Sequence, residues 1–186
     1  YKIALLKYKL TPHQVKLIHE EAKKLGMGTI GELGYTSYKE GGAIGVDAFV
    51  HTTRYSLDVA PEAMRMAVAE HPFSNDLESA KWKYYQYLYG LDPTDPGLQE
   101  HANNLASSGT FLMPTLSLLY GDLPDMENPW KETVASILNP ADINNPLDKT
   151  TGTHNYPIEV QENYTAMGLQ ELVIESIYKA SGNKYL

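Results

Sequence analysis

Two polar residues of kinds that bind metals or transfer protons stand at the ends of short apolar runs. Glu32 follows the run 27–31, and His51 follows the run 46–50. If both runs are parallel strands, their carboxyl ends place these side chains where a β/α barrel builds its active site. A carboxylate and an imidazole there predict metal binding or proton transfer. The alternatives are a hydrogen-bonded histidine without chemistry and a carboxylate that caps a helix or forms a salt bridge.

Two cationic residues near these runs are weaker candidates. Lys2 stands early in an apolar run, where a solvated strand end is the plainer interpretation. Arg54 follows His51 by three positions, and its planar guanidinium is suited to holding a substrate carboxylate, with a surface ion pair as the alternative. The other histidines form no His-x-x-x-His or Glu-x-x-His metal pair.

The elements that would position these residues alternate along the first half of the chain. Apolar periodicity and capping residues predict strands at 2–6, 27–31, 46–50 and 110–113, and helices at 12–25, 38–44, 61–68, 77–90 and 96–107. Connections of this length predict parallel strands joined by helical crossovers. The stretch 69–91, which holds Trp82 and four tyrosines, is interpreted as a helical insertion whose aromatic residues pack rather than form a ligand cage. Further along we expect a loop-rich region over 121–156, with a short helix at 131–138, and a long helix over 157–180.

Composition limits the classes of function. Fifteen basic and 23 acidic residues give a net charge of −8, which disfavours nucleic acid as a partner. No apolar run reaches the length of a membrane span. The absence of cysteine excludes disulfides and thiolate metal sites within these 186 residues and leaves the compartment undetermined. The chain starts and stops within strand-like runs, so we expect a segment of a longer protein.

Several stretches in order resemble the amidohydrolase superfamily, in its imidazolonepropionase-like and metal-dependent dipeptidase-like branch. Gly45-Val46-Asp47-Ala48-Phe49-Val50-His51 resembles the "Gly-Val-Asp-x-Ile-x-His" sixth strand of that branch. Residues 1–27 resemble its fourth strand and the following helix, residues 108–116 its seventh strand, and residues 178–186 the approach to its eighth strand. The resemblance implies an α/β fold, a partial TIM-like (β/α) barrel with about strands four to seven and a helical insertion.

The resemblance also implies a chemistry. Members hold one or two divalent metals, usually zinc, that activate a water for attack on a carbonyl carbon. His51 would be the sixth-strand metal ligand, and Lys2 would match a lysine that some members carboxylate to bridge two metals. Arg54 and Tyr35 would contact a small-molecule or peptide-like substrate. The function implied is hydrolysis of an amide or other C–N bond by a parent protein that supplies the missing parts of the barrel.

The chain departs from the family pattern at three places. The His-x-His of strand one and the aspartate of strand eight are not in this sequence, so we expect these residues alone to be inactive. Glu32 stands near the place of the fifth-strand histidine, which leaves open a replacement oxygen ligand, a lost second metal or a degenerate member. The rival hypothesis is therefore a non-catalytic binding protein on the same barrel. A metal-free parallel barrel enzyme is a third, although no glycine-rich phosphate loop is visible.

Overall fold

The described part of the chain is built on one small parallel sheet. The computed structural model describes residues 2–51, 55–72, 78–92, 94–113 and 137. The sheet has four strands in sequence order, β1 (Ile3–Leu6), β2 (Gly28–Gly31), β3 (Ala48–Val50) and β4 (Phe111–Met113). Each neighbouring pair is parallel. The predicted α/β class with parallel strands is therefore confirmed.

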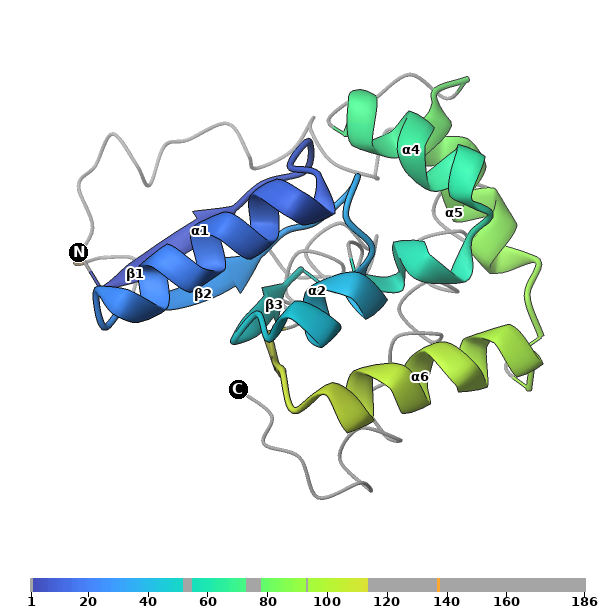
Figure 1. The fold of residues 1–186 in the computed structure, drawn as a ribbon. Coiled ribbons are helices and arrows are strands. Elements are labelled where there is room, and N and C mark those ends of the chain that lie inside the picture. Colours follow the sequence, from blue (N-terminus) through green and yellow to red (C-terminus); the bar gives the residue numbers. More distant parts are fainter. Residues whose placement is uncertain (1, 52–54, 73–77, 93, 114–136, 138–186) are drawn as a thin grey trace.

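Helices connect the strands (Figure 1). α1 (Pro12–Lys24) joins β1 to β2, and α2 (Tyr38–Ile44) joins β2 to β3. Between β3 and β4 lie η1 (Ser56–Val59), α4 (Glu62–Glu70), α5 (Ala80–Tyr89) and α6 (Pro96–Ser108). The 3₁₀ segment η1 was not predicted from the sequence. The loop-rich stretch 121–156, the short helix at 131–138 and the helix at 157–180 remain predictions, because they lie outside the described ranges apart from residue 137.

Both crossover helices of the first half begin at a capping box. The Thr11 hydroxyl accepts a hydrogen bond from the backbone N–H of Gln14, and the Gln14 side chain accepts one from the backbone N–H of Thr11. Ser37 and Glu40 make the same reciprocal pair at the start of α2. These bonds satisfy amide groups that the first turn of a helix leaves unpaired. α2 ends at Gly45, whose φ of 97° is in the left-handed region that glycine adopts without strain.

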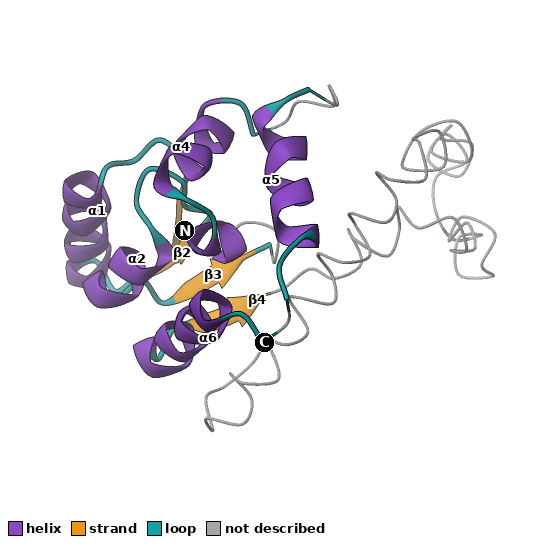
Figure 2. Ribbon diagram, turned by 90° about the vertical axis from the view of Figure 1, so that its right-hand side faces the viewer, coloured by secondary structure: helices purple, strands orange, loops and turns teal. Residues whose placement is uncertain are grey.

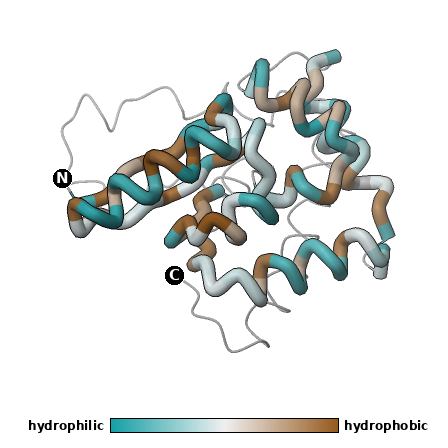
Figure 3. Tube along the Cα trace, viewed as in Figure 1, coloured by the Kyte–Doolittle hydropathy of each residue, from teal (hydrophilic) through white to brown (hydrophobic). Residues whose placement is uncertain are grey.

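One face of the sheet is covered by helices. Figure 2 shows α1, α2 and α6 on the same side of the strands. Figure 3 shows that α1 carries both hydrophilic and hydrophobic residues, as expected of a helix with one face against a sheet. The row of paired residues that faces these helices is buried and consists of Leu6, Gly31, Phe49 and Leu112. The side chains of Leu6, Phe49 and Leu112 are fully buried.

The opposite face of the sheet carries apolar residues that are less covered. Side chains alternate between faces along a strand, so the adjacent row, Leu5, Ile30, Ala48 and Phe111, points away from the helices. Leu5 is 53% exposed and Ile3, on the same face, is 57% exposed. A parallel sheet is ordinarily buried on both faces, so this arrangement is unusual for an isolated layer.

The helices between β3 and β4 form a second hydrophobic cluster. Residues of η1, α4 and α5 pack together, and Trp82, Tyr84 and Tyr85 are buried there. The prediction that the aromatic residues of this stretch pack in a helical core is confirmed. The insertion over 69–91 stays a prediction; α5 lies within it and packs on α4, which begins at Glu62.

A polar network ties α1 to β2 and β3 at the amino end of the sheet. The Asp47 carboxylate accepts hydrogen bonds from Lys23 Nζ at 2.5 Å and from the backbone N and Oγ1 of Thr29 at 2.8 and 2.9 Å. His19 Nδ1 lies 2.9 Å from Thr29 Oγ1. Since buried polar groups cost stability unless they are hydrogen-bonded, this network gives His19 and Asp47 a structural role.

Candidate functional site at the carboxyl edge of the sheet

Glu32 and His51 meet at the carboxyl edge of the sheet. Glu32 follows β2, with its backbone N–H bonded to the Leu6 carbonyl at 2.8 Å, and His51 follows β3, with its N–H bonded to the Met113 carbonyl at 3.0 Å. The two side chains approach until His51 Nε2 lies 3.7 Å from Glu32 Oε1. The parallel register thus brings together two residues that lie nineteen positions apart in the sequence.

The Glu32 carboxylate is buried and accepts hydrogen bonds from two residues of the loop between β1 and α1. Lys7 Nζ donates to Oε2 and the Tyr8 hydroxyl donates to Oε1, each at 2.6 Å. Burial raises the pKa of Glu32, but the hydrogen bonds from Lys7 and Tyr8, with the charges of Lys7 and His51, outweigh it and lower that pKa below its ordinary value of 4.5. Glu32 is therefore an anion at neutral pH.

His51 has an unusual backbone conformation for its residue type. Its φ of 63° lies in the left-handed region, and among the described residues it is the only non-glycine with a positive φ. Such a conformation costs roughly 1–2 kcal/mol in an L-residue, and strained residues of this kind cluster at functional sites. The break in strand geometry at His51 accompanies the approach of its imidazole to Glu32.

The loop after Glu32 is fixed by its backbone. Tyr35 N donates to the Tyr8 carbonyl at 2.7 Å, and the Tyr35 carbonyl accepts a hydrogen bond from Arg65 Nη1 at 2.9 Å. The same Arg65 nitrogen also donates to the Gly34 carbonyl. A side chain at Gly34 would lie only 2.7 Å from both the Tyr8 carbonyl oxygen and Ala69 Cβ. The loop therefore approaches its neighbours closely on both sides.

The structure brings together some of the predicted site residues and not others. Glu32 and His51 are adjacent, and the half-buried Tyr35 is in the loop that follows Glu32. Lys2 is exposed and precedes β1, so it lies at the amino end of the sheet, where its carbonyl bonds the backbone N of Gly28. The lysine that reaches Glu32 is Lys7. Arg54 lies outside the described residues.

Lys7 and Tyr8 are site residues that the sequence interpretation missed. A signal was present: Lys7 follows the strand β1 directly, as Glu32 follows β2 and His51 follows β3. Lys7 also continues the alternation of Ile3 and Leu5, which places it on the same face of the sheet as Glu32. The rule that identified Glu32 and His51 would have identified Lys7 as well.

The donor set for a metal is incomplete in this part of the chain. An imidazole and a carboxylate are ligand types that zinc accepts. Within the described ranges, however, no group of three histidine, aspartate or glutamate side chains could hold a metal ion. Both oxygens of Glu32 already accept hydrogen bonds from Lys7 and Tyr8. A complete site would need donors from outside these residues, and Glu32 is better placed to face His51 than to bind a metal itself.

Fold and site together define an α/β protein with a polar cluster at the carboxyl edge of a parallel sheet. Comparison of the chain with protein-family models, with curated proteins and with solved structures finds no match. Among the helices that the structure describes, none has both the length and the apolar character needed to cross a bilayer.

Replacing Lys7 with glutamine is expected to raise the pKa of Glu32. The variant replaces the charged ammonium donor, which lowers this pKa through its hydrogen bond and its charge, and leaves the burial that raises it. The pKa of Glu32 in the folded protein lies below the ordinary value of 4.5, so ionised Glu32 stabilises the wild-type fold at pH values above 4.5. This stabilisation is lost as the pH falls through the pKa of Glu32 in the folded protein. Carboxyl ¹³C NMR titration measures the change.

Lys9→Gln, which breaks an exposed pair with Glu70, is the matched control, and equal Glu32 titrations in the two variants would refute the assignment.

Proposed function

We propose that this chain belongs to a metal-dependent hydrolase of the amidohydrolase type, which cleaves an amide or other C–N bond at the carboxyl edge of a (β/α) barrel. The observation that carries the proposal is the meeting of Glu32 and His51 at the ends of adjacent parallel strands, 3.7 Å apart. Active sites of β/α barrels are built at this edge from residues that follow different strands.

The exposed apolar face of the sheet supports a barrel. Ile3 and Leu5 on β1 are more than half exposed, on the face opposite the helices. Within the described ranges, β1 and β4 each have a strand on one side only. Closure of further strands onto these edges would bury the apolar row in the barrel interior, where side-chain layers form the core. The four strands would then be about the fourth to the seventh of the barrel.

His51 and Glu32 have different roles in this proposal. His51 would hold the metal through one imidazole nitrogen, while Glu32 faces Nε2 and orients the ring, as carboxylates commonly do for metal-binding histidines. Lys7 and Tyr8 fix the Glu32 carboxylate in position and keep it ionised. A bound divalent metal, zinc in the first instance, would supply an activated water. Tyr35 and Arg54 are proposed to contact a small-molecule or peptide-like substrate.

A non-catalytic binding protein on the same barrel is the second candidate. The observation that favours it is the occupation of both Glu32 oxygens by Lys7 and Tyr8, at the place where the resembled family has a histidine ligand. A protein that has lost one metal ligand could keep the barrel and its substrate pocket without hydrolysis. The two candidates predict the same fold and differ in turnover.

The test compares the full-length parent protein with its His51→Asn variant. Asparagine tolerates the left-handed backbone at this position but removes the imidazole. We expect bound zinc, measured by elemental analysis, and hydrolysis of a panel of dipeptides and small amides both to fall at least about tenfold. His13→Asn, which changes an exposed histidine on α1, should leave both unchanged. Unchanged zinc in His51→Asn would refute the metal assignment, and a wild type that binds zinc through His51 without turnover would favour the binding protein.

A further inference from the structure

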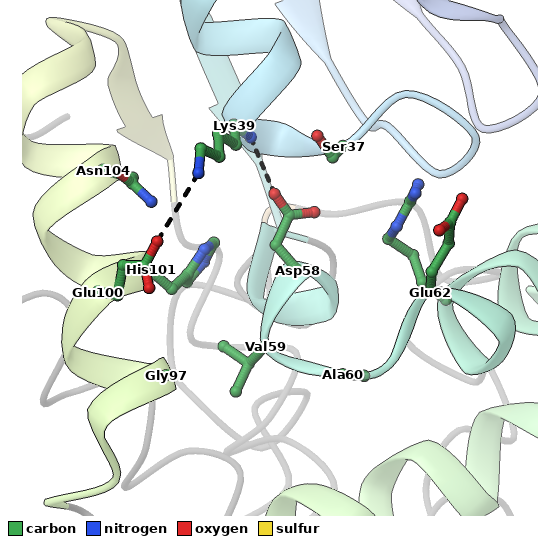
Figure 4. A pocket seen from close by; sticks show the side chains of 11 residues that line it. Ser37, Lys39, Asp58, Val59, Ala60, Glu62, Gly97, Glu100, His101 and Asn104 are labelled. Atoms are coloured by element: carbon green, nitrogen blue, oxygen red, sulfur yellow. Dashed lines mark hydrogen bonds and ion pairs between the residues drawn. The ribbon is translucent and has the colours of Figure 1, made fainter.

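A second polar pocket lies away from the Glu32–His51 cluster. It is formed between the start of α2, the segment η1 and the first half of α6, and its volume is about 360 Å³ (Figure 4). That volume is within the usual range of about 300–1,000 Å³ for small-molecule sites. Neither Lys7, Glu32 nor His51 lines it. The proposed hydrolase activity gives this pocket no role.

His101 is a buried side chain with an unused hydrogen-bonding atom in this pocket. His101 is 5% exposed, and its imidazole is hydrogen-bonded to the backbone of Tyr55. Because this bond raises the pKa of His101, the imidazole N–H is the donor. Nε2 has no hydrogen-bond partner among the described residues, so Nδ1 is the donor. Burial lowers the pKa of His101 and outweighs this bond and the charge of Asp58. The ring is thus neutral at pH 7, and Nε2 carries a lone pair.

Asp58 supplies a second unused acceptor. Its Oδ2 accepts a hydrogen bond from the backbone N of Lys39 at 2.8 Å, whereas its buried Oδ1 has no hydrogen-bond partner in the described part of the chain. Figure 4 shows Asp58 and His101 entering the pocket from η1 and α6. Two acceptors without a donor at one pocket suit a ligand that brings N–H or O–H groups, because unpaired buried acceptors are costly.

The cations that line the pocket are already engaged. Lys39 Nζ lies 3.7 Å from Glu100 Oε1, and Arg65 donates to the Gly34 and Tyr35 carbonyls. The lining also contains Glu62, so its carboxylates outnumber its cations. The charge balance therefore favours a donor that is positively charged over a neutral hydroxyl.

We propose that this pocket binds the primary ammonium group of a small molecule, which donates hydrogen bonds to Asp58 Oδ1 and His101 Nε2. The proposal is independent of the hydrolase assignment, since no residue of the Glu32–His51 cluster takes part. A small ammonium probe has few atoms to bind with, so the expected dissociation constant is on the order of millimolar.

The test titrates the ¹⁵N-labelled protein with n-butylammonium chloride and, in parallel, with tetramethylammonium chloride at constant ionic strength. Tetramethylammonium carries the same charge without an N–H donor. We expect saturable shifts of the Lys39 amide and the His101 ring nitrogens with n-butylammonium, and at least tenfold weaker binding of tetramethylammonium. Equal affinity for the two cations, or no saturable shift with n-butylammonium, would overturn the proposal without any variant.

Two variants then distinguish a specific hydrogen bond to Asp58 from general attraction by the negative charge of the pocket. Asp58→Asn retains an oxygen for the Lys39 amide and replaces the charged free acceptor with an N–H donor, and we expect it to weaken n-butylammonium binding at least tenfold. Glu62→Gln removes the same charge from the rim of the pocket and should change the affinity less than about threefold. Equal losses in both variants would indicate diffuse charge attraction and would contradict the specific site.

Discussion

In the full-length parent protein, Glu32→Gln is expected to reduce hydrolysis about 10–100-fold while the protein remains folded. Glutamine keeps the shape of the side chain, but its single carbonyl oxygen can replace only one of the two oxygens that accept hydrogen bonds from Lys7 and Tyr8, and it removes the negative charge that faces His51. Loss of the carboxylate beside a metal-binding imidazole typically costs this factor in activity or metal affinity. Turnover of the amide panel, zinc affinity and circular dichroism give the three readouts.

The matched control for this variant is Glu70→Gln. Glu70 is exposed and pairs with Lys9, so its replacement removes the same charge outside the site and should leave activity within about twofold. If Glu32→Gln kept full activity and zinc affinity, Glu32 would be a structural carboxylate only. If both variants lost activity equally, net charge rather than position would be the cause.

Phe49→Ala is expected to destabilise the protein by about 3–5 kcal/mol. Phe49 is fully buried in the central row of the sheet, between Gly31 and Leu112, and its ring makes an edge contact with Tyr38 at a centroid distance of 4.7 Å. Its removal leaves a cavity beneath α2. Urea unfolding followed by circular dichroism measures the change, and a cost below about 1 kcal/mol would contradict the described core.

Leu5→Ala is the companion variant, on the other face of the sheet, and it tests the barrel. Leu5 is 53% exposed in the described structure, and substitutions at exposed positions usually change the free energy of unfolding by no more than about 0.5 kcal/mol. In a closed barrel the same side chain would be interior, and its truncation would cost about 2–5 kcal/mol. The proposal predicts the larger value. The smaller value would contradict the barrel and leave the Phe49 core intact.

The sequence was sufficient to predict the sheet and one pair of site residues. The capping residue Thr11 and the glycine at Gly45 are local signals, so α1 and α2 were located closely. The juxtaposition of Glu32 and His51 followed from parallel pairing, because that pairing is set by the length of the crossovers and by strand alternation. Each of these features lies within a single strand–helix–strand unit.

Other features depend on contacts that no local pattern records. Lys7, and not Lys2, contacts Glu32 because Lys7 lies at the carboxyl end of β1 and Lys2 at its amino end. The left-handed backbone of His51 has no sequence signature, since histidine is not a residue that requires it. Asp58 and His101 lie 43 positions apart and meet only because η1 and α6 pack together. Tertiary packing, rather than propensity, places all of these residues.

The most direct test of the proposed metal site is an anomalous difference map at the zinc edge, from crystals of the protein as isolated without added metal. We expect a peak about 2.0–2.1 Å from an imidazole nitrogen of His51, with Glu32 beside the ring and not bound to the metal. A zinc peak that is bound elsewhere, with His51 in contact only with Glu32, would contradict it.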